Sequence, residues 1–237
     1  MQQLDLFGRD KHQDVHKRKN ERSVKDPRLG QARAGVWDLW SPQVDLEKEM
    51  ALFFLDIRNF TSLAEKHQAI NVIHIIKKLF STFQHIIRVH HGRIIETSGD
   101  GFYAAFGFES GVTEAVNAAV ESGKAIIKTL EQLNSLTFEK NLGQPIDVGI
   151  GVHVGMVATG NLYVDSKDHM VVMGYAVNVA SRLQAATREL GNNFVVSADV
   201  FRMLKNPAVS NLPVKVNLKG LKNVIEVHLI GKAYTDH

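Results

Sequence analysis

Two aspartates, each placed where an apolar run is interrupted, are the residues of this chain best suited to chemistry. Asp56 follows the apolar run at residues 51–55, and Asp100 lies in a Ser-Gly-Asp-Gly turn between two further apolar segments. A carboxylate at the end of a buried strand is costly to desolvate without a partner group. Two carboxylates on neighbouring strands can share a pair of hard cations such as Mg²⁺. That pair suits an in-line displacement at phosphorus, in which metals hold the attacking and leaving oxygens.

Each aspartate also has a purely structural interpretation. Asp-Gly between two apolar runs is a strong hairpin signal that needs no chemistry. An aspartate at a strand-to-helix junction often only caps the helix. For either residue alone both interpretations stay open, so the choice between them depends on the rest of the chain.

A second group of polar residues could contact a nucleotide. Asn178 and Arg182 are four residues apart, which places them on one face of a helix. An amide and a guanidinium there can bind a ribose and a phosphate, although such a pair is usually only solvated surface. Lys219 precedes Gly220 between two predicted strands, where it can bind a phosphate or lie in a plain turn.

The elements that must position these residues follow from the spacing of apolar residues. The pattern predicts an α+β fold, with an antiparallel-rich sheet and helices on one face, and not a regular βαβ repeat. We expect Gly92 to end the first helix and Gly155 to break a strand pair. The predicted strands are residues 50–56, 93–98, 102–106, 146–153, 156–160, 214–218 and 224–230, and the predicted helices are 70–91, 113–133 and 177–190.

Length and charge indicate one large domain preceded by a tail. The chain has 237 residues and a net charge of +3, and residues 1–33 hold nine Lys and Arg against five Asp and Glu. We predict a basic polar tail or adaptor at residues 1–45 and a catalytic domain at 46–237. The interspersed acids favour a solvated extension over a nucleic-acid-binding or membrane-binding arm. Trp37 and Trp40 could dock the tail on the domain or on a partner.

Several function classes are excluded by composition. The absence of cysteine rules out disulfides, Cys-ligated zinc and thiol catalysis, and it fits a reducing compartment. No run approaches the roughly 20 apolar residues that span a bilayer. The N-terminus lacks the apolar core of a secretory signal. We therefore expect a cytoplasmic protein, without nucleic-acid binding or membrane association.

Five segments together resemble the catalytic domain of class III adenylate and guanylate cyclases, in order and with similar spacing over about residues 46–231. None is specific alone, but five in order are not expected by chance. The segments are residues 54–61 (FLDIRNFT), 96–101 (ETSGDG), 149–155 (GIGVHVG), 177–182 (VNVASR) and 218–220 (LKG).

The resemblance implies a ferredoxin-like core related to the polymerase palm, working as a head-to-tail homodimer. Asp56 and Asp100, with the backbone carbonyl of Ile57, would hold two Mg²⁺ or Mn²⁺ ions per site. The turn after Asp56, with Phe60 and Thr61, would offer backbone N–H groups to the substrate phosphates. Many relatives have Gly where this chain has Asn59, and we expect Asn to tolerate the left-handed backbone that the turn needs.

The resemblance also assigns the nucleotide-contacting residues to the second subunit. Asn178 would orient the ribose, Arg182 would stabilise charge on the transferred phosphoryl group, and Lys219 would bind the terminal phosphates. A monomer would then be inactive, and a homodimer would hold two equivalent sites. The implied reaction converts a nucleoside triphosphate, ATP or GTP, into its 3′,5′-cyclic nucleotide and pyrophosphate for intracellular signalling.

Two positions bear on the choice of base. Adenylate cyclases usually carry Lys at the position of Glu96, whereas guanylate cyclases carry Glu, which can accept from guanine's N–H groups. Glu96 therefore favours GTP, unless it is only a solvent-facing strand residue. The second base-reading position is Val171, which can neither donate nor accept a hydrogen bond, so half of the recognition code is absent. Gly149 is a further departure, because several relatives place an Arg there.

Other functions remain open from the sequence. A catalytically silent nucleotide-binding regulatory module of the same fold is kept open by Val171 and Gly149. It is disfavoured because silent relatives typically lose a metal Asp, the Asn or the Arg, and all of these are present here. A diguanylate cyclase or another palm enzyme should lack the segments at 177–182 and 218–220. A nucleic-acid binder would show salt-sensitive binding that is lost on truncation of residues 1–33.

Overall fold

The computed structural model describes residues 47–164, 167–207, 212–221 and 223–233. The predicted tail at residues 1–45, with Trp37 and Trp40, lies outside the described residues. Among the helices of the described part, none is long and apolar enough to cross a membrane.

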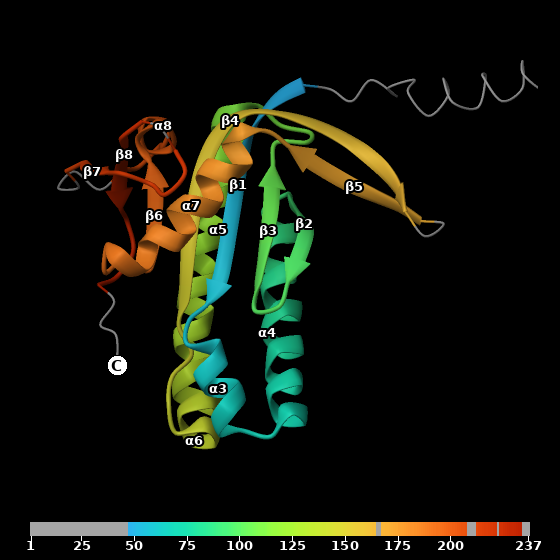
Figure 1. The fold of residues 1–237 in the computed structure, drawn as a ribbon, viewed down its shortest axis with the longest axis vertical. Helices are drawn as coiled ribbons and strands as arrows, with labels where there is room; N and C mark the ends of the chain where they lie inside the picture. Colours follow the sequence, from blue (N-terminus) through green and yellow to red (C-terminus); the bar gives the residue numbers. More distant parts are fainter. Residues whose placement is uncertain (1–46, 165–166, 208–211, 222, 234–237) are drawn as a thin grey trace, which may run out of the picture. The chain divides into compact units, whose positions relative to one another are not determined.

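The centre of the domain is an eight-stranded sheet in the order β2-β3-β1-β4-β6-β8-β7, with β5 paired to β4 (Figure 1). All of its pairings are antiparallel except that of β4 with β6. The predicted antiparallel-rich α+β fold is therefore confirmed. The strands are β1 (Glu47–Ile57), β2 (Gly92–Ser98), β3 (Gly101–Phe106), β4 (Val148–Val164), β5 (Lys167–Met173), β6 (Phe194–Ser197), β7 (Val214–Val216) and β8 (Ile225–Leu229).

Helices cover both faces of this sheet, so the expectation of helices on one face was wrong. The core that includes Ala51 and Phe53 of β1 also contains buried residues of α4 (Ala69–Val89) and α5 (Val112–Leu133). Leu52, on the opposite face of β1, is buried with residues of α7 (Tyr175–Glu189), which crosses on the other side from α5 (Figure 1). Because β1 is apolar on both faces, each face needs a cover.

The long helix α4 ends at Val89 and not at Gly92, because His91 takes the left-handed backbone with φ 62°.

Short elements complete the chain, and most of them were not predicted. Strands β5 and β6 were missed, since both are short or polar in pattern. The remaining elements are α3 (Phe60–Lys66), the π-helix η1 (Asn134–Phe138), α6 (Glu139–Leu142) and α8 (Ala198–Arg202).

The predicted strand break near Gly155 is wrong. β4 runs unbroken through Gly155, which pairs with Met50 of β1. A Cβ placed on Gly155 would lie 3.0 Å from the Cβ of Ala176 in α7. The glycine therefore reflects the close approach of a helix and not a turn. Beyond this point β4 continues into a hairpin with β5, which extends away from the sheet (Figure 1).

A partly buried histidine links β4 to β6 and predicts a pH dependence of stability. The Nδ1 atom of His153 lies 2.9 Å from the hydroxyl oxygen of Ser197, which is fully buried. Burial lowers the pKa of His153 from 6.5 to about 4. Between these values the unfolded chain binds more protons than the folded one, so stability falls as the pH drops below about 6.5. The loss should reach about 3 kcal/mol near pH 4.

Substitution of this histidine tests the prediction. In His153→Gln the free energy of unfolding should fall less steeply below about pH 6.5 than in the wild type, because the variant has no imidazole to protonate at that position. The measurement is the free energy of unfolding by urea from about pH 7.5 to about pH 4. Parallel curves for the wild type and the variant would show that His153 does not cause the acid sensitivity.

Candidate active site

The structure brings Asp56 and Asp100 together at one end of the central strands. Asp56 is paired with Gly101 of β3, the residue that follows Asp100 in the chain. The backbone N–H of Ile57 donates to the carbonyl of Asp100 at 3.0 Å, which fixes the β2–β3 turn against the end of β1. Both aspartates line one hollow of about 380 Å³, whose other polar lining residues are Glu96, Ser98, Tyr103 and Gln184.

The electrostatics of this hollow favour a bound cation. Burial, and then the nearby charge of Asp100, raise the pKa of Asp56 from 3.8 to about 6, while Arg188 and Arg58 act in the opposite direction. A carboxylate that is desolvated and repelled in this way is stabilised by a positive charge. In the described part of the chain, no cluster of three or more His, Cys, Asp or Glu could hold a metal alone. Mg²⁺ is often held by one or two carboxylates plus substrate phosphates and water, and this donor set fits that mode.

The turn after Asp56 has the backbone predicted for it. Asn59 adopts the left-handed conformation, with φ 52° and ψ 27°, and α3 begins at the next residue. The tolerance of Asn for this conformation is therefore confirmed. Phe60 is partly buried against the core, whereas Thr61 is exposed. The first N–H groups of α3 have no partner within the helix, which leaves the turn able to donate to an anion.

A second hollow, of about 700 Å³, gathers the predicted base-reading and ribose-binding residues. It is lined by Glu96 of β2, Val171 of β5 and Asn178 of α7, which are far apart in the sequence. Sequence reasoning missed two of its polar lining residues, Tyr103 and His169. His169 precedes Val171 by two residues, and that strand spacing could have indicated it.

Tyr103 connects the two hollows, because it lines both of them. Its hydroxyl donates to the carbonyl of Val172 at 2.9 Å, and its ring stacks on Phe54 with centroids 4.9 Å apart. Burial raises the pKa of Tyr103 above its ordinary value, so the hydroxyl stays protonated. Glu96 also lines both hollows, so the two form adjacent parts of one surface.

Arg182 and Lys219 are not brought to the aspartates within one chain. Both side chains are exposed, and neither lines either hollow. Arg182 lies one turn after Asn178 on α7, and Lys219 lies in the turn before Gly220, which has φ 81°. This separation is compatible with the expectation that these residues serve a site on another subunit.

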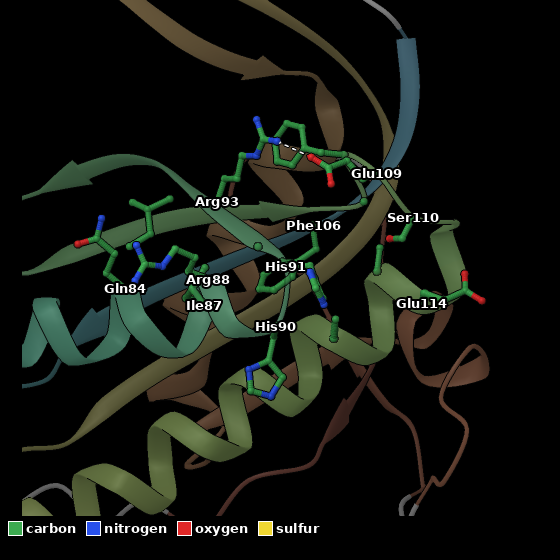
Figure 2. Close-up of a pocket in the computed structure, with 16 residues that line it drawn as sticks. Gln84, Ile87, Arg88, His90, His91, Arg93, Phe106, Glu109, Ser110 and Glu114 are labelled. Carbon is green, nitrogen blue, oxygen red and sulfur yellow. Dashed lines mark hydrogen bonds and ion pairs between the residues drawn. The ribbon is translucent and has the colours of Figure 1, made fainter.

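A further hollow, of about 680 Å³, lies at the opposite end of β2 and β3 from Asp100 (Figure 2). Its walls come from the end of α4 and the start of α5, and they include His91, Phe106 and Glu114. An ion pair of 2.8 Å joins Arg93 to Glu109 at its rim (Figure 2). None of the predicted site residues lines it.

Fold and site together describe an α+β domain with two aspartates in one hollow, and comparison with known proteins gives the family. Residues 42–232 match the family model described as the adenylate and guanylate cyclase catalytic domain. The chain therefore belongs to this family, and the class predicted from the sequence is confirmed.

Individual relatives agree with this assignment. The chain is 30% identical over 185 residues to an adenylate cyclase of Anabaena cylindrica, covering 76% of this chain and 36% of the relative. It thus spans about a third of that protein's length. Among solved structures, the adenylyl cyclase CyaB from P. aeruginosa superimposes with a TM-score of 0.69 at 23% identity, covering 81% of this chain and 98% of that one. The guanylyl cyclase Cya2 gives 0.70 at 23% identity, covering 78% and 93%. These two structures confirm the fold.

Proposed function

We propose that this chain is a purine nucleotide cyclase that converts GTP or ATP into the 3′,5′-cyclic nucleotide and pyrophosphate, for signalling. The observation that carries the proposal is the meeting of Asp56 and Asp100 in one hollow, at a carboxylate whose pKa is raised to about 6. Family membership supports the reaction class. Asn178, Arg182 and Lys219 are all present at the motif positions that the resemblance predicts.

In this proposal Asp56 and Asp100, with the carbonyl of Ile57, hold two Mg²⁺ or Mn²⁺ ions. The bound ions would lower the pKa of the ribose 3′-hydroxyl and neutralise the phosphates. The turn that Asn59 opens would donate to phosphate oxygens through the first N–H groups of α3, at Phe60 and Thr61, because the first N–H groups of a helix have no acceptor within it.

The partner subunit supplies the other half of the proposed site. Asn178 would orient the ribose so that its 3′-oxygen lies in line with the α-phosphorus and the leaving pyrophosphate. Arg182 would stabilise the charge that grows on the phosphoryl group during transfer. Lys219 would bind the terminal phosphates as a point charge.

A homodimer is supported by the surface around the second hollow. Met156, Met173 and Tyr175 are each more than half exposed, at 57%, 56% and 62%. Met173 lines the hollow itself, and Tyr175 begins the helix that carries Asn178. Exposed apolar side chains that are grouped in this way are typical of protein interfaces. In the head-to-tail homodimer that the resemblance implies, a second copy of the chain would bring Arg182 and Lys219 to the other subunit's aspartates.

We propose GTP as the preferred substrate. Glu96 lines the same hollow as Asn178, so a base bound beside the ribose site lies within its reach. Its carboxylate can accept from guanine's ring N–H and exocyclic amine, whereas adenine offers no such pair. Tyr103 and His169 supply further polar groups in a hollow where Val171 supplies none.

The experiment that tests this function measures cyclic AMP and cyclic GMP by mass, from ATP and GTP separately, with Mg²⁺ and with Mn²⁺. We expect cyclic GMP in excess from the wild type. Glu96→Lys should lower the GTP/ATP ratio of kcat/KM by on the order of 10² or more, because a hydrogen-bond acceptor is replaced by a donor. Glu65→Lys, an exposed carboxylate on α3, is the matched control and should leave the ratio unchanged. Cyclic AMP in excess from the wild type would contradict the role of Glu96.

The second candidate is a catalytically silent regulatory module, which Val171 and Gly149 kept open from the sequence. The structure offers a packing reason for Gly149, because a Cβ there would lie 2.6 Å from the hydroxyl oxygen of Thr187. Val171 remains the observation in favour of this candidate. Absence of product from either nucleotide, in a sample shown to be dimeric, would favour the silent module.

A further inference from the structure

One side chain of the hollow that Asp56 and Asp100 line belongs to α7, the helix that also carries Asn178 and Arg182. Gln184 lines this hollow together with Asp56 and Asp100. Two residues along a helix correspond to a rotation of about 200°. Gln184 therefore leaves α7 on nearly the opposite side from Arg182, which is exposed. The helix thus presents Gln184 to its own chain's aspartates.

Close packing holds this amide in place. A Cβ placed on Gly151 would lie 2.2 Å from the backbone nitrogen of Gln184, so α7 lies directly on β4. A Cβ on Gly149 would lie 3.1 Å from the side-chain nitrogen Nε2 of Gln184, and Gly149 is the cross-strand partner of Asp56. The hydroxyl of Thr187 donates to the backbone carbonyl of Gln184 within α7. These contacts place the amide beside the strand position of Asp56.

The surroundings of this amide are polar on the strand side. The Nη2 atom of Arg58 lies 3.2 Å from the same Cβ position on Gly149, and Arg58 is only 6% exposed. A guanidinium, a hydroxyl and an amide therefore meet over Gly149, next to a carboxylate. The amide of Gln184 is the group among these three that lines the hollow.

We propose that Gln184 is a positioning residue for the divalent cations at Asp56 and Asp100 of its own chain, acting through a hydrogen bond to a metal-bound water. The inference rests on the proposed function. A neutral amide both donates and accepts, so it can orient coordinated water without adding charge to a site that already holds two carboxylates. Loss of such an outer contact typically costs 10–100-fold in metal affinity or activity. Helix α7 would then contribute to both sites of the dimer, with Gln184 serving one and Asn178 and Arg182 the other.

The first test measures metal binding without turnover. Mn²⁺ alone is titrated into the nucleotide-free protein, and the free ion is followed by electron paramagnetic resonance. Gln184→Leu should bind Mn²⁺ at least about 10-fold more weakly than the wild type, and Gln184→Glu should recover affinity because it still accepts from water. Gln84→Leu, the same change at an exposed position of α4, should bind as the wild type does. Wild-type affinity in Gln184→Leu would overturn the proposal.

The second test separates a site-specific role from general damage to α7. In a heterodimer of an Asp56→Asn chain and an Arg182→Ala chain, the one working site takes its aspartates from the Arg182→Ala chain. Gln184→Leu on that chain should lower kcat/KM by about 10-fold or more, whereas the same change on the Asp56→Asn chain should have no effect. Equal losses from both placements would overturn the proposal. If the wild type forms no cyclic nucleotide, the proposed function fails. The Mn²⁺ titration still tests whether Gln184 supports metal binding.

Discussion

Asp56→Asn is expected to abolish cyclic-nucleotide formation and, at the same time, to make the metal-free protein more stable above neutral pH. The pKa of Asp56 is raised from 3.8 to about 6 by burial and by Asp100. Between these values the folded chain holds a proton that the unfolded chain releases, so stability is greatest at low pH and falls as the pH rises through 6. At neutral pH the half-buried charge should cost on the order of 1–2 kcal/mol once solvent screening is allowed for, and Asn removes that cost.

The loss of activity has a separate cause. An amide cannot replace a carboxylate as a ligand to Mg²⁺ or Mn²⁺ without loss of charge, so we expect kcat/KM to fall by on the order of 10³ or more. Stability is measured by urea unfolding in the presence of a chelator, at about pH 5 and about pH 8. The variant should exceed the wild type at both values, and its advantage at about pH 5 should be roughly half of that at about pH 8. Added Mn²⁺ should stabilise the wild type alone.

A matched control separates this effect from charge removal in general. Glu139→Gln removes an exposed carboxylate on α6, and it should change neither stability nor turnover measurably. An Asp56→Asn protein that keeps turnover, or that is no more stable than the wild type at about pH 8, would contradict the assignment of Asp56 as a desolvated metal ligand.

The local sequence explains why the part of the candidate site that contains Asp56 and Asp100 could be predicted. The turn at Asp100 is specified by its own Ser-Gly-Asp-Gly residues, and the run before Asp56 is specified by its own apolar composition. Antiparallel pairing of β1 with β3 then brings the two carboxylates together. Asn59 could likewise be assigned to a left-handed turn, because that preference belongs to the residue itself.

Features that depend on distant packing could not be predicted in this way. Gly155 looks like a strand breaker in the sequence, whereas its cause is Ala176 on a helix that begins 20 residues later. Gln184 looks like an ordinary polar position on α7, because nothing local shows that the helix lies against Gly149 and Gly151. Tyr103 looks like a core residue, and only the approach of β5 reveals its bond to Val172.

Loss of Arg182 is the second large effect that we expect. Arg182→Ala should lower kcat by about 10²–10³ with little change in KM, because in the proposed mechanism the guanidinium stabilises charge that develops during transfer. The side chain is exposed on α7, so its removal should change the free energy of unfolding by less than about 0.5 kcal/mol. Steady-state kinetics with the preferred nucleotide, together with urea unfolding, measure both quantities.

The proposed sharing of sites between two subunits makes a stronger prediction for mixtures. Asp56→Asn and Arg182→Ala alone should each keep about 1% of wild-type activity or less. After subunit exchange half of the dimers would carry both chains, and each of these dimers would have one intact site. The mixture should therefore recover about a quarter of wild-type activity. Asp56→Asn mixed with Asp100→Asn is the matched control, and it should recover none, because both changes damage the same half of the site. A dead Asp56→Asn and Arg182→Ala mixture, under conditions where exchange is demonstrated, would mean that Arg182 does not complete the site of a second subunit. The separation of Arg182 from the aspartates within one chain would then need another explanation.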